Sequence, residues 1–250
     1  MNISQEQHNF NNRLSIILPT YNESQNIVNM LDAIKNVLPY DLYAEIIIVD
    51  DNSPDGTGKI VEEHIKKNKE QKISFKVIHR INKRGLSSAI LDGIKTSTGK
   101  IIVVMDSDFS HPPEKILDML HEIQKNNYDV VVGSRYVTGG NSIGWPLSRK
   151  IISLIGTLIA EHGLGIKIKD SMSGFFSFKK ELIDDIQFDA IGYKLLLEIL
   201  VKTNSSMVKE IPYTCINRKQ GATKFNKSVI LDYVKLVKSL YKYKKEKKSS

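Results

Sequence analysis

Short apolar runs alternate with amphipathic segments along the first half of the chain. Runs rich in β-branched residues are typical of buried strands, and apolar residues spaced three and four apart are typical of helices covering a sheet. The predicted strands lie at residues 14–18, 46–49, 75–78, 101–105 and 130–132. Helical patterns separate these strands, so the chain forms consecutive βαβ units. We therefore expect an α/β fold with a mainly parallel central sheet and helices on both faces.

The second half of the chain has a less regular pattern. Its predicted elements are a Gly-rich loop, an apolar helix, a strand, a helix, a second strand, a polar loop and a last helix. They are assigned, in that order, to residues 138–145, 151–160, 171–178, 195–200, 208–216, 220–226 and from 227 onward. No linker or repeat interrupts them. We expect a flexible polar N-terminus at 1–13, one domain at 14–241 and a basic tail at 242–250.

Composition excludes several classes of protein. Hydrophobic residues make up 41% and charged residues 26% of the 250 residues, as in ordinary globular chains. A membrane-spanning helix needs about 20 mostly apolar residues, whereas the longest uninterrupted apolar run is 101–105. The first residues lack the apolar stretch of a signal peptide. The single cysteine, Cys215, rules out an internal disulfide framework and favours the cytosol.

Acidic side chains follow three of the predicted strands, and an arginine follows a fourth. The residues concerned lie in Pro-Thr-Tyr-Asn-Glu at 19–23, Asp-Asp-Asn-Ser-Pro-Asp-Gly at 50–56, Asp-Ser-Asp at 106–108 and Gly-Ser-Arg at 133–135. Ligands of open α/β sheets bind outside the carboxyl ends of the strands. We therefore expect these side chains to meet at one edge of the sheet.

The Asp106-x-Asp108 pair is the sharpest of these features. Two carboxylates on a turn after a buried strand can bind one Mg²⁺ or Mn²⁺, with phosphate oxygens and water completing the shell. Ser110 is a candidate third ligand. The alternative is that the two acids only cap a turn or a helix, as aspartates often do.

The motifs taken in order resemble those of the family 2 glycosyltransferases, which have the Rossmann-like GT-A fold. The resemblance is closer still to the dolichol-phosphate mannose synthases of that family, and it extends over residues 14–241. Further similar segments are Arg-Gly-Leu-Ser-Ser-Ala at 84–89, Gly-Trp-Pro-Leu-Ser-Arg-Lys-Ile-Ile-Ser at 144–153, Asp-Ser-Met-Ser-Gly-Phe at 170–175 and Asn-Arg-Lys-Gln-Gly-Ala-Thr-Lys at 217–224. The resemblance implies a nucleotide-sugar half at 14–135 and an acceptor half at 136–241.

What the resemblance implies is transfer of mannose from GDP-mannose to a polyprenyl (dolichyl) monophosphate, with Mg²⁺ or Mn²⁺ as cofactor. The residues implied in guanosine binding are Pro19, Tyr21, Glu23, Val49 and Asp51. Those implied at the diphosphate and metal are Asp106, Ser107, Asp108 and Ser110. Those implied in phosphate contacts are Arg135, Arg149, Ser153, Arg218 and Lys224. Asp108, Arg135 and Arg149 are the candidate catalytic residues.

This chemistry agrees with the residue types. A phosphate monoester has a second pKa near ~6, so the acceptor oxygen is already anionic at neutral pH and a strong base is unnecessary. A cationic clamp is needed instead to bring two anions together, and arginine binds phosphate bidentately. The alternative for Arg135 and Arg149 is an ordinary surface ion pair. Trp145 could contact sugar or lipid, or serve as a buried anchor.

The C-terminal end carries most of the net charge. The last 22 residues hold seven lysines against Asp232 and Glu246, so +5 of the formal +8 lies there. Apolar residues fall on one side of the last helix and lysines on the other, which fits an anchor in a membrane interface or a packed helix with a solvated tail. Residues 151–160 could contact the lipid chain or form a core helix. We expect a peripheral protein on the cytosolic face of a membrane, held there by this helix and tail or by a membrane partner subunit.

Three other functions compete with this one. A UDP-glucose-dependent polyprenyl-phosphate glucosyltransferase would carry overlapping motifs. A non-catalytic nucleotide-sugar-binding module would keep the fold but lose the metal acids, and Asp106 and Asp108 argue against it. Nucleic-acid binding through the tail is disfavoured, because the charge is confined to one end and no reader motif is present.

Overall fold

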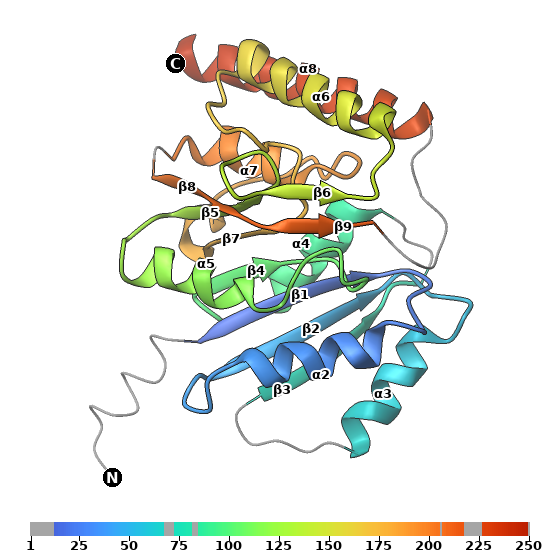
Figure 1. The fold of residues 1–250 in the computed structure, drawn as a ribbon. Helices are drawn as coiled ribbons and strands as arrows, with labels where there is room; N and C mark the ends of the chain where they lie inside the picture. Colours follow the sequence, from blue (N-terminus) through green and yellow to red (C-terminus); the bar gives the residue numbers. More distant parts are fainter. Residues whose placement is uncertain (1–12, 68–72, 82–84, 206, 218–226, 250) are drawn as a thin grey trace.

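A seven-stranded sheet is the centre of the molecule (Figure 1). The computed structural model describes residues 13–67, 73–81, 85–205, 207–217 and 227–249. In spatial order the strands are β3 (Ile73–His79), β2 (Ala44–Asp50), β1 (Leu14–Thr20), β4 (Ile101–Val104), β7 (Phe176–Lys179), β5 (Val130–Ser134) and β8 (Val208–Pro212). Only β7 runs antiparallel to its neighbours. The predicted mainly parallel sheet is therefore confirmed.

Helices cover both faces of this sheet, as predicted. One face carries α2 (Ile27–Val37), α3 (Thr57–Lys67) and α5 (Lys115–Gln124). The other carries α4 (Leu86–Thr96), the short 3-10 helix η1 (Lys180–Ile183) and α7 (Leu195–Thr203). Alternate residues of β1 point to opposite faces, so Ile16 packs in the first layer and Ile17 in the second.

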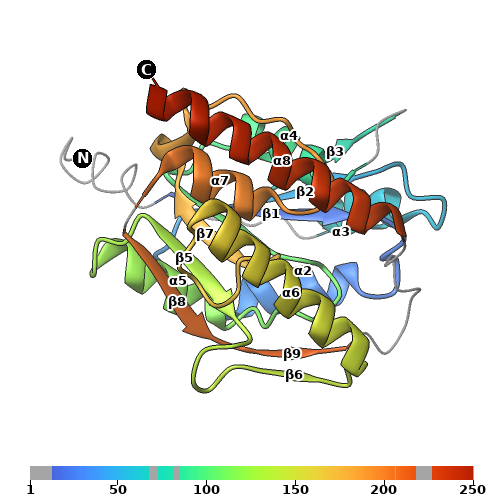
Figure 2. The same cartoon turned by 90° about the horizontal axis from the view of Figure 1, so that it is seen from above.

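Two long helices form an additional layer over α7. They are α6 (Leu147–Leu164) and α8 (Lys227–Ser249), which lie side by side in both views (Figures 1 and 2). Buried side chains such as Ala160, Leu197 and Leu236 join the three helices in one apolar cluster. Tyr233 adds a polar link, because its hydroxyl donates to the Gly156 carbonyl oxygen at 2.5 Å.

The second half of the chain differs in detail from the sequence prediction. The strand expected at 208–216 is two strands, because Pro212 has no N–H to continue the ladder and the chain then changes sheets. Its second part, β9 (Thr214–Ile216), pairs with β6 (Asn141–Ile143), which lies inside the predicted loop. The strand expected from 171 begins only at Phe176, because a turn precedes it, in which the Ser173 N–H donates to the Asp170 carbonyl oxygen.

The structure can be compared with the domain boundaries predicted at the two ends of the chain. Residues 1–12 of the expected flexible N-terminus lie outside the described residues. At the other end α8 continues to Ser249, so the expected tail at 242–250 is mostly the last turns of a helix. Lys244 is fixed there, since its ammonium donates to the Leu164 carbonyl oxygen at 2.6 Å. Within the described residues, no helix is both long and apolar enough to span a bilayer.

Candidate functional site

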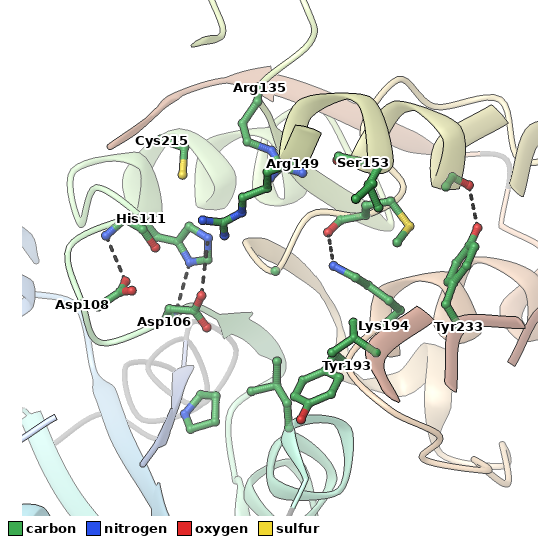
Figure 3. A pocket seen from close by; sticks show the side chains of 18 of the residues that line it. Asp106, Asp108, His111, Arg135, Arg149, Ser153, Tyr193, Lys194, Cys215 and Tyr233 are labelled. Carbon is green, nitrogen blue, oxygen red and sulfur yellow. Dashed lines mark hydrogen bonds and ion pairs between the residues drawn. The ribbon is translucent and has the colours of Figure 1, made fainter. Parts of the chain in front are cut away.

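A cavity of about 820 Å³ opens at the carboxyl ends of β1, β2, β4 and β5 (Figure 3). It extends from these strand ends to the space between α6 and α8. The sequence-predicted residues that line it are Pro19, Tyr21, Glu23, Asp51, Asp106, Ser107, Asp108, Ser110, Arg135, Arg149 and Ser153. Parallel topology thus brings together side chains that lie far apart in the sequence.

Among the predicted residues that the structure describes, Val49 is not in this lining. Val49 is fully buried and its side chain packs against the α4 layer, next to Gly93. A Cβ on Gly93 would lie 3.1 Å from the Val49 side chain, so that side chain fills the core and not the cavity. Arg218 and Lys224 lie outside the described residues.

Asp51 is held by an arginine that the sequence analysis did not single out. Arg80 is buried, and its guanidinium donates to one Asp51 carboxylate oxygen at 2.6 Å. The Gly85 N–H donates to the other oxygen at 3.0 Å. Asp51 therefore enters the cavity with a fixed orientation and ties the strand ends to the start of α4. The position of Arg80 one residue after β3 was the only available signal.

The two candidate metal ligands, Asp106 and Asp108, lie on a tight turn after β4. The Asp108 side chain accepts a hydrogen bond from the Ser110 N–H at 3.0 Å. Phe109, which lies between Asp108 and Ser110, has a positive φ of 61°. The Ser107 hydroxyl is buried and has no hydrogen-bond partner among the described residues. A buried donor left in this state in a cavity wall is expected to bond a ligand.

The residues present fit a divalent cation bound together with a diphosphate. Among the described residues, no cluster of three or more His, Cys, Asp or Glu side chains could hold a metal by itself. Mg²⁺ needs no such cluster, because it typically takes one or two protein carboxylates and fills its shell with phosphates and water. Asp106 and Asp108 supply that number, and Ser110 lines the same cavity.

His111 lies next to Asp106 and supports this turn (Figure 3). Its Nδ1 accepts the Asp106 backbone N–H at 2.9 Å, and its ring stacks on Phe175 at a centroid distance of 5.0 Å. Burial lowers the pKa of His111, although Asp106 and Asp108 act to raise it. The imidazole is therefore neutral, which leaves Nδ1 free to accept. The sequence analysis did not single out His111 for any role.

Arg135 is a buried and paired arginine. Its Nε and Nη2 donate to the two carboxylate oxygens of Asp170 at 2.7 and 2.6 Å, and its backbone N–H donates at 2.9 Å. Burial alone would lower the pKa of Arg135, but the bonds and charge of Asp170 outweigh burial and raise it. The partner is thus a buried carboxylate and not the surface acid of the alternative interpretation.

Lys194 is a further cation that the sequence analysis missed. It lies just before α7 and lines the cavity, where its ammonium donates to the Met172 carbonyl oxygen at 2.7 Å (Figure 3). Burial and then the charge of Arg135 lower its pKa to about 8. The sequence offered one signal for Lys194. It directly precedes the apolar run of a predicted helix and so lies at the start of that helix.

Arg149 and Ser153 lie on the first turns of α6, on the side that faces the cavity (Figure 3). Arg149 donates to the Asn217 side-chain oxygen at 3.3 Å. The Ser153 hydroxyl is buried and, within the described part of the chain, lacks a hydrogen-bond partner. The helix thus presents a cation and a hydroxyl to the same space.

Beyond Ser153 the cavity wall becomes apolar. It is formed by side chains of α6 and α8, namely Ile152, Ile155, Ile159, Ile230, Tyr233 and Val234. The outer face of α6 is also apolar, with Ile151, Leu154 and Leu158 each about half exposed. The stretch 151–160 is therefore not a fully buried core helix. The cavity has a charged end at the sheet and an apolar end between the two helices.

A model of the family described as glycosyl transferase family 2 matches residues 15–187. The chain belongs to this family. Solved structures agree in fold: glucosyl-3-phosphoglycerate synthase from Mycobacterium tuberculosis, in complex with Mn²⁺, UDP-glucose and glycerol 3-phosphate, has a TM-score of 0.67 at 16% identity. The match covers 96% of this chain and 83% of that one.

Curated relatives are similar over most of the chain. A dolichol-phosphate mannosyltransferase from Pyrococcus furiosus is 39% identical over 94% of this chain, which spans 65% of that protein's length. An undecaprenyl-phosphate mannosyltransferase from Micrococcus luteus is 31% identical, with 87% of this chain and 89% of that protein covered. A dolichol-phosphate mannosyltransferase from Saccharomyces cerevisiae is 34% identical, with 92% and 87% covered.

Proposed function

We propose that this protein transfers mannose from GDP-mannose to a polyprenyl (dolichyl) monophosphate and releases GDP. The observation that carries the proposal is one continuous cavity with acids and cations at the sheet edge and an apolar wall between α6 and α8. A nucleotide sugar and an isoprenoid phosphate together need such a site, because one is polar throughout and the other has a long apolar chain. The names of the three relatives support the same reaction.

The donor is assigned to the strand-end half of the cavity. Pro19, Tyr21, Glu23 and Asp51 surround the guanosine. Val49 contributes at most through its backbone, since its side chain lies in the core. Asp106 and Asp108 would hold Mg²⁺ or Mn²⁺, and the cation would neutralise charge on the departing GDP. Ser107 and Ser110 offer hydroxyls at the same place.

The acceptor phosphate is assigned to Arg135, Arg149 and Ser153. One of its anionic oxygens attacks the anomeric carbon of mannose. The bond from that carbon to the β-phosphate oxygen of GDP breaks, and its electron pair leaves with GDP. The attacking oxygen carries no proton at neutral pH, so no base is required. Arg149 and Lys194 offset the repulsion between the two anionic substrates.

The outer faces of α6 and α8 are assigned to the membrane surface. Large apolar side chains of α6 are exposed together with Ile230 and Leu231 of α8, and exposed lysines such as Lys238 and Lys242 lie further along α8. An amphipathic surface of this kind inserts its apolar side between lipid headgroups, while lysines attract anionic lipid. The proposed location is the cytosolic face of a membrane, with or without a membrane partner subunit.

A panel of donors tests the reaction. The full chain is incubated with farnesyl phosphate, Mg²⁺ and radiolabelled GDP-mannose, UDP-glucose or UDP-N-acetylglucosamine, and label in the organic phase is counted. We expect turnover with GDP-mannose and little with the uridine donors. Preference for a uridine donor would contradict the mannosyl assignment but not the acceptor assignment. Farnesol in place of farnesyl phosphate is the control for the phosphate requirement.

A further inference from the structure

The only tryptophan of the chain lies against two of the arginines in the cavity. The Arg149 Cζ is 3.8 Å from the centroid of the Trp145 ring, and the Arg135 Cζ is 4.6 Å from it. Trp145 is partly buried and stands between β6 and the start of α6. The indole therefore connects an arginine that follows a sheet strand with an arginine that belongs to a helix.

The arginine on the sheet side is rigidly held. Arg135 is bound through three hydrogen bonds to Asp170, which is itself fully buried. The Asp170 backbone N–H donates in turn to Glu210 at 3.0 Å, and the N–H of Lys169 donates to the same carboxylate at 2.8 Å. The Arg135 guanidinium therefore has a fixed plane against which the indole can pack.

The arginine on the helix side is linked to the loop that carries Trp145. Arg149 donates to the Asn217 side-chain oxygen at 3.3 Å. Asn217 is fastened to the loop before Trp145, since its side chain donates to the Gly144 carbonyl oxygen at 3.1 Å. The indole face, whose centroid is 3.8 Å from the Arg149 Cζ, lies directly against the guanidinium and constrains its plane.

The indole ring also suits the charges around it. Arg149 is close enough to Lys194 for its charge, like that of Arg135, to help lower the pKa of that ammonium. Cations that face one another repel and tend to turn toward solvent. The face of an indole ring is electron-rich and attracts a guanidinium more strongly when water is excluded. Trp145 therefore offsets the repulsion that would otherwise turn Arg149 away.

We propose that Trp145 is a positioning residue for the acceptor phosphate: it holds the Arg149 guanidinium in a fixed plane beside Arg135, so that the two can bind one phosphate monoester. The inference rests on the proposed function, because it assigns the acceptor phosphate to these arginines. It adds a residue whose proposed role is exercised through Arg149. A guanidinium whose plane is already fixed loses less side-chain entropy when it binds phosphate bidentately, so the indole should raise acceptor affinity.

Tryptophan fluorescence of the full chain tests the contact directly, because all of the indole emission comes from Trp145. Farnesyl phosphate is titrated into the protein without donor, with inorganic phosphate and farnesol as parallel probes. We expect both phosphates to change the emission. Arg149→Gln should weaken farnesyl phosphate binding at least about tenfold. Lys150→Gln, which removes the same charge from the next residue, should bind normally. An emission response to farnesol alone, or none to any phosphate, would overturn the inference.

Substitution of the ring tests positioning. We expect Trp145→Leu to raise the KM for farnesyl phosphate about five- to thirtyfold, as loss of a cation–π contact implies. Trp145→Phe should retain most of the affinity, and the KM for the sugar donor should stay within about twofold in both variants. An unchanged acceptor KM in Trp145→Leu would overturn the proposal, as would equal losses for donor and acceptor with a lowered melting temperature.

The proposed function can fail while the role assigned to Trp145 still holds. If wild-type protein turns over none of the donors, the mannosyl assignment falls, and the inference is then judged by calorimetric binding of farnesyl phosphate to wild type, Trp145→Leu and Trp145→Phe. Weaker binding in the leucine variant that is restored by phenylalanine supports positioning. Equal binding in all three overturns it.

Discussion

Individual groups in the cavity are oriented by buried neighbours, two of which belong to distant parts of the chain. His111 holds the Asp106 backbone, Arg80 holds Asp51, and Asp170 holds Arg135. Each supporting group is buried and hydrogen-bonded, so each cavity-facing group keeps one orientation before substrate arrives. Preorganisation of this kind avoids reorganisation during the reaction.

Removal of one metal acid is the first prediction at this scale. Asp108→Asn should lower turnover at least about a hundredfold, because a divalent cation contributes several kcal/mol of charge stabilisation. Calorimetry should show weakened Mn²⁺ binding in the presence of GDP. Asp118→Asn is the matched control, since Asp118 pairs with Lys115 on the surface of α5. Undiminished turnover of wild type in EDTA would remove the cation from the reaction.

Lys194 predicts a pH dependence of donor binding. Burial and Arg135 lower its pKa to about 8 from 10.5, so the ammonium loses its proton as pH rises through 8. A diphosphate binds best to the charged form, and GDP affinity should therefore fall above pH 8 in wild type. In Lys194→Gln the affinity should be lower and nearly flat over the same range. Calorimetric titrations from pH 7 to 9.5 measure both, and parallel curves would contradict the assignment.

The pKa of Lys194 affects folding stability with the opposite sign from its effect on GDP affinity. Between pH 8 and 10.5 the unfolded chain keeps the Lys194 proton and the folded chain has lost it, so this residue makes folding more favourable as pH rises. The two measurements therefore separate a loss of binding from a loss of fold. A fall in thermal stability that parallels the fall in affinity would point to unfolding.

At the scale of elements, α6 has an unusual distribution of side chains. Gly156, Thr157 and Ala160 are buried, as is Leu164 in the last turn, whereas Ile151, Leu154 and Leu158 are about half exposed. A helix of a water-soluble protein normally buries its large apolar residues. The apolar pattern of 151–160 could not settle this, because it is compatible with a core helix and with a surface that contacts lipid.

The prediction for α6 concerns membrane binding. Ile151→Ser with Leu158→Ser should weaken co-sedimentation with vesicles strongly, since each removes about 2 kcal/mol of apolar transfer free energy. Lys238→Gln with Lys242→Gln should weaken binding only to anionic vesicles, by about 1 kcal/mol for each lysine. Turnover of farnesyl phosphate should survive in both double variants, because none of the four residues lines the cavity.

This design avoids removal of the end of α8, where Tyr243 packs on the helix layer and Lys244 caps α6. Exposed residues alone are changed, so a loss of binding cannot come from unpacking. If both double variants bind neutral and anionic vesicles as well as wild type does, the helix surface is not the anchor. A membrane partner subunit would then be the better explanation.

On the scale of the whole molecule, the cavity and a stabilising hydrogen-bond network lie at opposite ends of the strands. At the amino ends of the strands, the buried Glu45 carboxylate accepts hydrogen bonds from Ser15 of β1, Lys76 of β3 and the Thr98–Gly99 turn before β4. Burial opposes its charge, but the bonds from Lys76, Ser15 and Thr98 outweigh burial and hold its pKa at about 2. Glu45 therefore joins the strands at the edge far from the cavity.

Glu45→Gln should destabilise the fold by about 3 kcal/mol at neutral pH, because the carboxylate pKa is lowered from 4.5 to about 2. The lowered pKa contributes stability above pH 4.5, and that contribution disappears as pH falls toward 2. Urea unfolding at pH 7 and pH 3 measures the difference between wild type and variant. Farnesyl phosphate affinity below the melting temperature should not change, and an equal difference at both pH values would contradict the role of the charge.

The sequence alone determined the alternation of strands and helices, the parallel sheet and the strand-end acids. These follow from local periodicity, and the rule that parallel strands present their carboxyl ends to one edge needs no coordinates. The predicted residues of 14–135 accordingly lie around the cavity, apart from Val49. Its side chain points to the opposite face from its neighbours, and the register of β2 sets that face.

Only the tertiary structure decided what surrounds those acids. Arg135 with Asp170, Trp145 with Arg135, and Lys194 with Met172 are pairs formed by chain reversals that no local pattern encodes. Only the tertiary structure decided the position of α6 as well, because its apolar side chains would suit a buried core helix equally well. Which face a helix buries depends on the layer it packs against, and here α7 and α8 already fill that layer.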